Sequence, residues 1–201
     1  MTRLFIIGLT GGIACGKSAV AETLRRYFRA VTCDIDRITH WLLQPGGELF
    51  DVYVRHFGGK VVTQEGTLNR RLIGEIIFND DDERAWINSV AHPILLQRAR
   101  DFLVDSLQAG ARLVVLEVPL LFEVGWENFV DEVWAVYTYR EYQLKRLMIR
   151  DHLTEEQARA RINAQISTEE MLARADVKLL NVGGYKAMRR RVARAIHGRT
   201  F

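Results

Sequence analysis

Gly-Gly-Ile-Ala-Cys-Gly-Lys-Ser, at residues 11–18, is the stretch that determines the expected fold, and we call it the glycine loop. It fits the pattern G-x-x-x-x-G-K-[ST], with Gly11, Gly16, Lys17 and Ser18 in the fixed places. In this pattern glycines let backbone N–H groups converge on phosphate oxygens, the lysine reaches the terminal phosphates of a nucleotide, and the hydroxyl binds Mg²⁺. A glycine turn that binds nothing would need neither the lysine nor the serine. We expect ATP contacts from the whole loop: Gly11, Gly12, Ile13, Ala14, Cys15, Gly16, Lys17 and Ser18.

The residues around the glycine loop predict a strand before it and a helix after it. Residues 4–9 are almost wholly apolar, which is typical of a strand buried on both faces. After Ser18 the apolar residues recur at helical spacing, including Val20, Leu24 and Phe28. Strand, loop and helix in this order suit phosphate binding, because a helix N-terminus adds partial positive charge.

Length and composition indicate one domain with a substantial core. The chain has 201 residues, of which 48% are hydrophobic. No apolar run approaches the ~18 residues of a membrane span, and the start leads directly into the first expected strand. We therefore expect no signal peptide, no membrane partner and a cytoplasmic location. Cys15 and Cys33 lack metal-ligand spacing and read as reduced thiols. The net charge of +3 is mild. The basic residues near the end of the chain, Arg189, Arg190, Arg191 and Arg194, read as the solvated face of a packed helix, so we expect no nucleic-acid partner.

Two further expected strands end in acidic side chains. The second strand, residues 30–34, ends at Asp34, and the third, residues 112–119, carries Glu117. Ligands of open parallel sheets bind beyond the carboxyl ends of the strands. We assign Asp34 to function and Asp36 to a helix cap or a supporting role. Glu117 is a candidate for holding Mg²⁺, directly or through water, although aspartate is commoner at such a place.

The segment between these strands, residues 37–110, reads mostly as helix. It is far longer than the ~10–12 residues that a simple crossover needs. We interpret it as an inserted helical subdomain and as the natural place to bind an acceptor. Within it, Asn79 is expected to cap a helix, which His92-Pro93 then breaks. After the third strand, Leu121 and Phe122 read equally well as ordinary core or as a wall facing the substrate.

The remaining residues predict a lid and the end of the sheet. A fourth strand is expected over residues 131–138, and a helix over 140–150 carries Arg146 and Arg150 on one face. Thr154 is expected to cap a second basic helix, and we interpret residues 140–170 as a closing lid rather than a static charged hairpin. A fifth strand at 177–181 and a basic helix complete the chain. The expected fold is α/β: one domain over 1–201, with a five-stranded parallel core (1–36, 111–139 and 175–201), an inserted helical substrate subdomain (37–110) and a helical lid.

Short motifs occur along the whole chain. They are Gly8-Leu9-Thr10-Gly11-Gly12-Ile13 with Gly16-Lys17-Ser18, Asp34 with Asp36, His92-Pro93-Ile94, Pro-Leu-Leu-Phe-Glu at 119–123, Arg146 with Arg150-Asp151, Arg161-Ile162 with Gln165, and Ala175-Asp176 with Asn181 and Gly183. Together they resemble the dephospho-coenzyme A kinases, which are P-loop kinases similar to the nucleoside monophosphate kinases. Two departures are Leu180, where the family often has an acidic residue, and Glu117, where it often has aspartate.

The resemblance implies transfer of the ATP γ-phosphoryl group to the ribose 3′-hydroxyl of dephospho-coenzyme A, the last step of coenzyme A synthesis, with Mg²⁺ as cofactor. The catalytic residues would be Lys17 on the phosphates, Asp34 on the proton of the attacking hydroxyl, and Arg146 and Arg150 over the transferring group. Asn181 would flank the adenine of ATP. The acceptor would contact Asp34, His92, Leu121, Phe122 and Glu123.

Three other readings remain open at this point. Another P-loop kinase, acting on a nucleoside, nucleotide or small alcohol, would share the core and differ in the insertion. A GTP-dependent switch would need the guanine-reading pattern N-K-x-D, which the chain lacks. A nucleic-acid-binding protein that uses ATP is suggested only by the basic charge. The sequence leaves the oligomeric state open.

Overall fold

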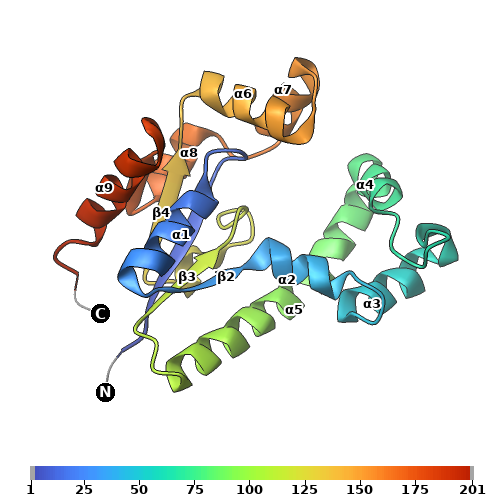
Figure 1. Cartoon of the computed structure of the whole chain (residues 1–201). Coiled ribbons are helices and arrows are strands. Elements are labelled where there is room, and N and C mark those ends of the chain that lie inside the picture. The colour runs from blue at the N-terminus through green and yellow to red at the C-terminus, as the bar shows by residue number, and fades with distance from the viewer. Residues whose placement is uncertain (1–2, 200–201) are drawn as a thin grey trace. The chain divides into compact units, whose positions relative to one another are not determined.

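The computed structural model describes residues 3–199 (Figure 1). The chain divides into two compact units, one made of the residues up to Asp34 together with those from Leu103 onward, and the other of Ile35–Phe102. The ends of the expected core, residues 1–2 and 200–201, lie outside the described residues. None of the described helices is long and apolar enough to cross a membrane.

The first unit is built on a five-stranded parallel sheet, so the expected fold class is confirmed. The strands are β1 (Phe5–Gly11), β2 (Val31–Asp34), β3 (Leu113–Glu117), β4 (Glu132–Tyr137) and β5 (Val177–Leu180). They follow the order β2-β3-β1-β4-β5, which places β1 at the centre. Since all strands run the same way, the loops that follow them meet at one edge of the sheet, where ligands of such sheets bind.

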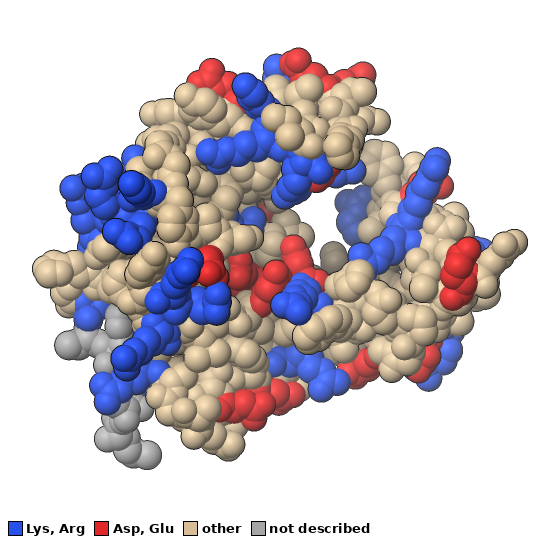
Figure 2. Space-filling model, viewed as in Figure 1, with Lys and Arg blue, Asp and Glu red and all other residues tan. Residues whose placement is uncertain are grey.

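Two helices that are distant in sequence pack together on this sheet. α1 (Lys17–Phe28) contacts α9 (Gly184–Ile196), and both lie beside the strands in Figure 1. The core that they share with the sheet includes Leu9, Leu24, Trp134, Met188 and Val192. Burying one such large apolar side chain stabilises the fold by about 1.5–3 kcal/mol. Arg189, Arg190 and Arg194 of α9 are exposed, whereas Arg191 is half-buried and donates to the Val182 carbonyl. Figure 2 shows basic side chains gathered where α9 lies, as expected for a packed helix with a solvated basic face.

Three of the described helices lie between β4 and β5 in the chain. α6 (Arg140–Asp151) and α7 (Glu155–Asn163) form the predicted helix pair, and Thr154 caps α7 through a capping box, as expected. Leu147, Ala158 and Ile162 form a small core of their own, against which Ile13 of the glycine loop also packs. α8 (Thr168–Arg174) was not predicted, although Ser167 followed three residues later by Glu170 is a helix-start signature and does cap this helix.

The second unit is helical. It contains α2 (Ile35–Leu42), α3 (Glu48–Phe57), the 3₁₀ turn η1 (Gly59–Val61), α4 (Arg70–Asn79) and the first part of α5 (Asp81–Gln108). Its aromatic side chains pack together: the His56 ring stacks on Trp86 with 3.5 Å between ring centroids, and Tyr53 and Phe57 contact the same tryptophan.

Two local expectations for this region are wrong. His92-Pro93 does not break the helix, because α5 continues through Pro93. A proline inside a helix costs about 3 kcal/mol. Ala91 before the proline and Leu95 after it are both buried, and this packing on either side of Pro93 helps the helix to continue. Asn79 does not cap α5 either. Its amide donates back to the Glu75 carbonyl, and the side chain of Asp80 accepts the first free N–H groups of α5.

Candidate active site

The glycine loop joins the end of β1 to the start of α1. Gly11 has φ 151°, and a Cβ added there would lie 2.3 Å from the Val136 carbonyl oxygen. Gly16 has φ 94°, and a Cβ there would lie 2.1 Å from Nδ2 of Asn181. Both positions therefore require glycine, because the backbone conformation and the close neighbours exclude a side chain. α1 begins at Lys17, directly after the loop, and the partial positive charge of a helix N-terminus makes the loop suited to bind an anion.

Lys17 brings a positive charge to this loop. Its Nζ donates a hydrogen bond to the Gly11 carbonyl oxygen at 2.7 Å, so the ammonium group lies over the loop. Ser18 follows in the first turn of α1 with an exposed side chain. Burial raises the pKa of the Cys15 thiol, and the charge of Lys17 only partly opposes this. Cys15 is therefore a neutral, buried part of the loop.

Two glutamines hold the loop at Ile13. The Ile13 N–H donates to Oε1 of Gln165 at 2.7 Å, and the Ile13 carbonyl accepts from Nε2 of Gln143 at 2.9 Å. The N–H of Cys15 is also used, since it donates to the Gly12 carbonyl at 3.1 Å. The N–H groups of Ile13 and Cys15 therefore have partners within the protein, and the ATP contacts expected from residues 11–18 remain a prediction. The lid motif had marked Gln165, whereas nothing in the sequence pointed to Gln143.

Asn181 lies at the other end of the loop. Its Nδ2 donates to the Cys15 carbonyl at 2.7 Å, and its own carbonyl accepts from Thr138 at 3.0 Å and from Nη2 of Arg146 at 3.3 Å. The structure thus brings together two residues that the sequence placed at the nucleotide, Asn181 and Arg146. Both lie beside the loop, and Asn181 ties the end of β5 to it.

The predicted carboxylates stand on neighbouring strands. Asp34 at the end of β2 is in register with Glu117 at the end of β3, and Glu117 is in register with Leu9 of β1. Asp34 is exposed and Glu117 is half-buried. Burial, and then the negative charges of Asp34 and Glu117, raise the pKa of Cys33 to about 12. The two carboxylates therefore lie at the same edge of the sheet as the glycine loop.

Asp36 does not occupy the helix-cap position that was one of its two expected roles. α2 begins at Ile35, immediately after β2 ends, so Asp36 lies inside the first turn of the helix. No residue separates the strand from the helix, so the position directly before the helix, where an N-cap stands, belongs to Asp34 and not to Asp36. At this position its negative charge still faces the favourable end of the helix dipole.

The oxygen atoms of Ser18 and Glu117 are the kind of ligand that Mg²⁺ prefers. Among the described residues, no group of three or more His, Cys, Asp or Glu side chains is arranged to hold a metal by itself. Mg²⁺ commonly uses one or two protein oxygens together with substrate phosphates rather than an all-protein cage. The residues present fit that mode of binding.

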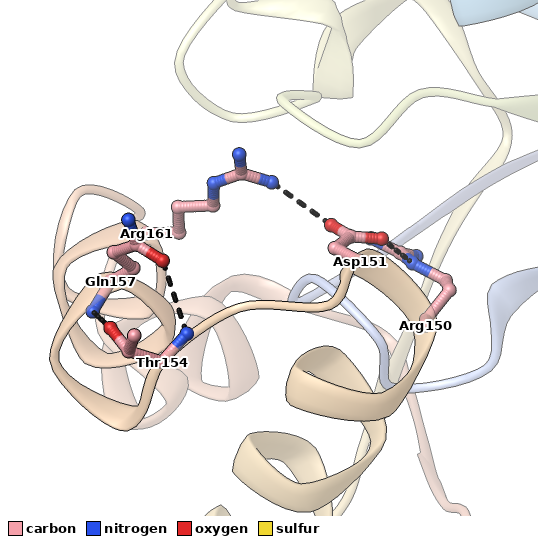
Figure 3. A network of polar contacts seen from close by, with 5 residues as sticks. All are labelled: Arg150, Asp151, Thr154, Gln157 and Arg161. Carbon is pink, nitrogen blue, oxygen red and sulfur yellow. Dashed lines mark hydrogen bonds and ion pairs between the residues drawn. The ribbon is translucent and has the colours of Figure 1, made fainter.

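The lid arginines have different partners. Figure 3 shows Arg150 and Arg161 converging on Asp151. Nε of Arg150 donates to Asp151 at 2.7 Å, and Nη1 of Arg161 donates to it at 2.9 Å. These two contacts hold the pKa of Asp151 below its usual range, and the contact with Arg150 has the larger effect. Arg146 instead reaches Asn181, so the predicted pair Arg146 and Arg150 does not act on one shared partner in this conformation.

The residues that were predicted to contact the acceptor lie in different surroundings. Leu121 is wholly buried and packs against Gly8 of β1, and Phe122 is 5% exposed. Both residues therefore belong to the core, and the alternative that they form a wall facing the substrate is corrected. Leu120 is the exposed member of this run. Glu123 is exposed and accepts a long hydrogen bond from the Ile166 N–H at 3.5 Å. His92 belongs to the second unit, where burial lowers its pKa from the usual 6.5.

Comparison with known proteins leads to one family. The family model described as dephospho-CoA kinase matches residues 5–187. A dephospho-CoA kinase of Carboxydothermus hydrogenoformans is 38% identical over 192 residues, which cover 96% of this chain and 93% of that protein. The crystal structure of TT1252 from Thermus thermophilus covers 96% of each chain with a TM-score of 0.82 and 32% identity. The dephospho-CoA kinase structure from Campylobacter jejuni covers 95% of this chain and 94% of its own, with a TM-score of 0.65 and 29% identity. The chain therefore belongs to the dephospho-CoA kinase family.

Proposed function

We propose that the protein transfers the γ-phosphoryl group of ATP to the ribose 3′-hydroxyl of dephospho-coenzyme A. Membership of the family supports this acceptor. The observation that carries the chemistry is the shared sheet edge: the glycine loop with Lys17 follows β1, and the carboxylates of Asp34 and Glu117 end the next two strands. A phosphate cradle beside an exposed carboxylate is what transfer to a hydroxyl group needs.

In the proposed reaction, the acceptor oxygen forms a bond to the γ-phosphorus while the bond to the bridging oxygen of ADP breaks. The exposed carboxylate of Asp34 accepts or orients the proton of the attacking hydroxyl. Lys17 leaves the Gly11 carbonyl to bind the β- and γ-phosphates and balances the charge that develops there. Ser18, and Glu117 directly or through water, would hold Mg²⁺, which supplies further charge neutralisation between these phosphates.

The lid contributes positive charge. Arg146 already lies beside the loop at Asn181, and we propose that it contacts the phosphates when ATP is bound. Arg150 would exchange Asp151 for the transferring group when the lid closes. Asn181 would flank the adenine, and His92 and Glu123 remain proposed contacts of the acceptor. We place this reaction in the cytoplasm, with ATP and dephospho-coenzyme A as the partners.

The test is a competition assay with ATP, Mg²⁺ and equal concentrations of dephospho-coenzyme A, AMP and adenosine. We expect dephospho-coenzyme A to be preferred by at least roughly 100-fold in kcat/KM, which corresponds to about 2.7 kcal/mol of differential transition-state binding. Phosphorus NMR of the product should show the new phosphate on the 3′-oxygen. Equal use of adenosine, or phosphate at another position, would reject this acceptor in favour of a nucleoside kinase.

A further inference from the structure

A cavity of about 620 Å³ lies in the first unit beside the glycine loop. Its walls come from the ends of β1 and β4, the turn after β3, the start of α6 and the segment that runs from α7 into α8. It shares Gly11 and Gly12 with the glycine loop, while Lys17, Ser18 and Asn181 are not part of its lining. The cavity therefore adjoins the phosphate site without being that site.

The charge of the lining argues against a phosphate. It contains two carboxylates, Glu123 and Glu169, and one guanidinium, Arg140. Nη2 of Arg140 already donates to Oδ1 of Asn163 at 2.6 Å. A second phosphate group would face net negative charge here, whereas the cationic groups Lys17 and Arg146 lie at the loop itself. The cavity suits a neutral ligand.

The rest of the lining mixes apolar surface with amide and hydroxyl groups. Its apolar members are Pro119, Ile162, Ile166, Met171 and Leu172. Its neutral polar members are Tyr137, Thr138, Tyr139, Gln143, Asn163, Gln165, Ser167 and Thr168. Such a surface matches a flexible chain in which short hydrocarbon segments alternate with amides, because each kind of group finds its counterpart. The volume lies within the ~300–1,000 Å³ of ordinary small-molecule sites, which is enough for a whole arm of that kind.

We propose that this cavity binds the pantetheine arm of the acceptor, and this rests on the proposed function. The arm is neutral, carries two amides and a hydroxyl, and is attached to the nucleotide through two phosphates. Its phosphates would stay near the cationic groups of the loop and the lid while the arm enters the cavity. Glu123 and Gln165 would pair with its hydroxyl and amides, and Leu172 would contact its hydrocarbon segments.

The substitution Leu172→Trp tests the proposal, because it fills the cavity from α8. Ala173→Trp is the matched control, since this neighbour on the same helix is exposed and outside the lining. The measured quantity is kcat/KM for dephospho-coenzyme A and for AMP, which has the 3′-hydroxyl but lacks the arm. For Leu172→Trp we expect a fall of roughly 10- to 100-fold with dephospho-coenzyme A and no change with AMP or in the KM for ATP. For the control Ala173→Trp we expect kcat/KM to stay at the wild-type level with both acceptors.

Glu123→Gln is a second variant in case Leu172→Trp does not fold. It keeps the size of the side chain and removes the charge, and we expect a several-fold increase in the KM for dephospho-coenzyme A alone. If kcat/KM in the folded variants falls equally with both acceptors, or falls with neither, the assignment of the cavity is overturned. The proposed function would still stand in that case, provided that the wild type phosphorylates dephospho-coenzyme A. Absence of wild-type activity with dephospho-coenzyme A would instead overturn the proposed function itself.

Discussion

The glycine loop and two of the lid arginines, Arg150 and Arg161, are held in opposite ways. Ile13 is bonded to Gln143 and Gln165, which are 130 and 152 residues away, and Asn181 bonds Cys15 across 166 residues. In the lid, Asp151 is bonded to Arg150, its neighbour, and to Arg161, ten residues on. The loop contacts are part-buried, whereas the lid contacts are exposed. Exposed ion pairs contribute little to stability.

This difference separates a fixed site from a movable one. A phosphate cradle acts best when its donors are already in place, because nothing then has to reorganise during the reaction. A lid must exchange partners when substrates bind, and weak, local ion pairs allow that exchange. We therefore expect substitutions in the loop and beside it to act on chemistry or stability, and those in the lid to act mainly on the closed state.

The largest effect is expected for Asp34→Asn. Removing the group that takes the proton should lower kcat by roughly 10²–10⁴ with little change in ATP binding. Asp36→Asn is the matched control and should lower kcat far less, since Asp36 lies inside the first turn of α2. Steady-state kinetics and ATP titration would measure both. Greater damage from Asp36→Asn would reverse the roles that we assign.

Lys17→Ala should lower kcat by roughly 10²–10³, the usual cost of removing one preorganised group that stabilises charge. The fold should persist, because the lysine is only half-buried and its removal leaves no core cavity. Turnover and circular dichroism would be measured together. Near-normal turnover in a folded variant would contradict the role of the glycine loop.

Gln143→Ala tests whether the loop is held from outside. Gln143 is 5% exposed, and its loss leaves the Ile13 carbonyl without that donor. We expect a loss of about 1–3 kcal/mol in the free energy of unfolding and a higher KM for ATP. Denaturant unfolding gives the first quantity and kinetics the second. An unchanged KM for ATP would mean that the loop keeps its shape without this contact.

Arg150→Ala should act on the lid. We expect kcat to fall by roughly tenfold while binding of ATP alone changes little, because the arginine engages only on closure. Proteolysis within residues 140–165 should slow in the wild type when both substrates are present. Unchanged cleavage would indicate a static hairpin.

The smallest effect concerns Cys33 and pH. Its pKa of about 12 is raised from 9.0 by burial and by the two carboxylates, so the folded state favours the neutral thiol. This contribution to stability is full below pH 9 and is lost as the pH rises towards 12. Cys33→Ala should therefore show a flatter decline of Tm between pH 8 and pH 10.5 than the wild type. Parallel declines would mean that the thiolate is tolerated in the fold.

Local patterns were sufficient for the elements of the sheet and for the loop. The apolar run expected at 112–119 became β3 (Leu113–Glu117), and residues 11–18 form the expected loop between β1 and α1. Apolar runs, glycines and caps act between neighbours in the chain, so they can be recognised without the fold. The S-x-x-E signature at Ser167, which caps α8, is a local pattern of the same kind.

By itself, the sequence determined the parallel sheet, the glycine loop and the carboxylate at the end of β2. Only the tertiary structure decided that Asp34 stands beside Glu117, that Leu121 packs on Gly8 while Leu120 is exposed, and that two glutamines hold Ile13. It also decided that α5 runs on through Pro93. The physical reason is range: propensity and periodicity record the interactions of a residue with its neighbours. Register, burial and long-range hydrogen bonds depend instead on segments that meet only after the chain has folded.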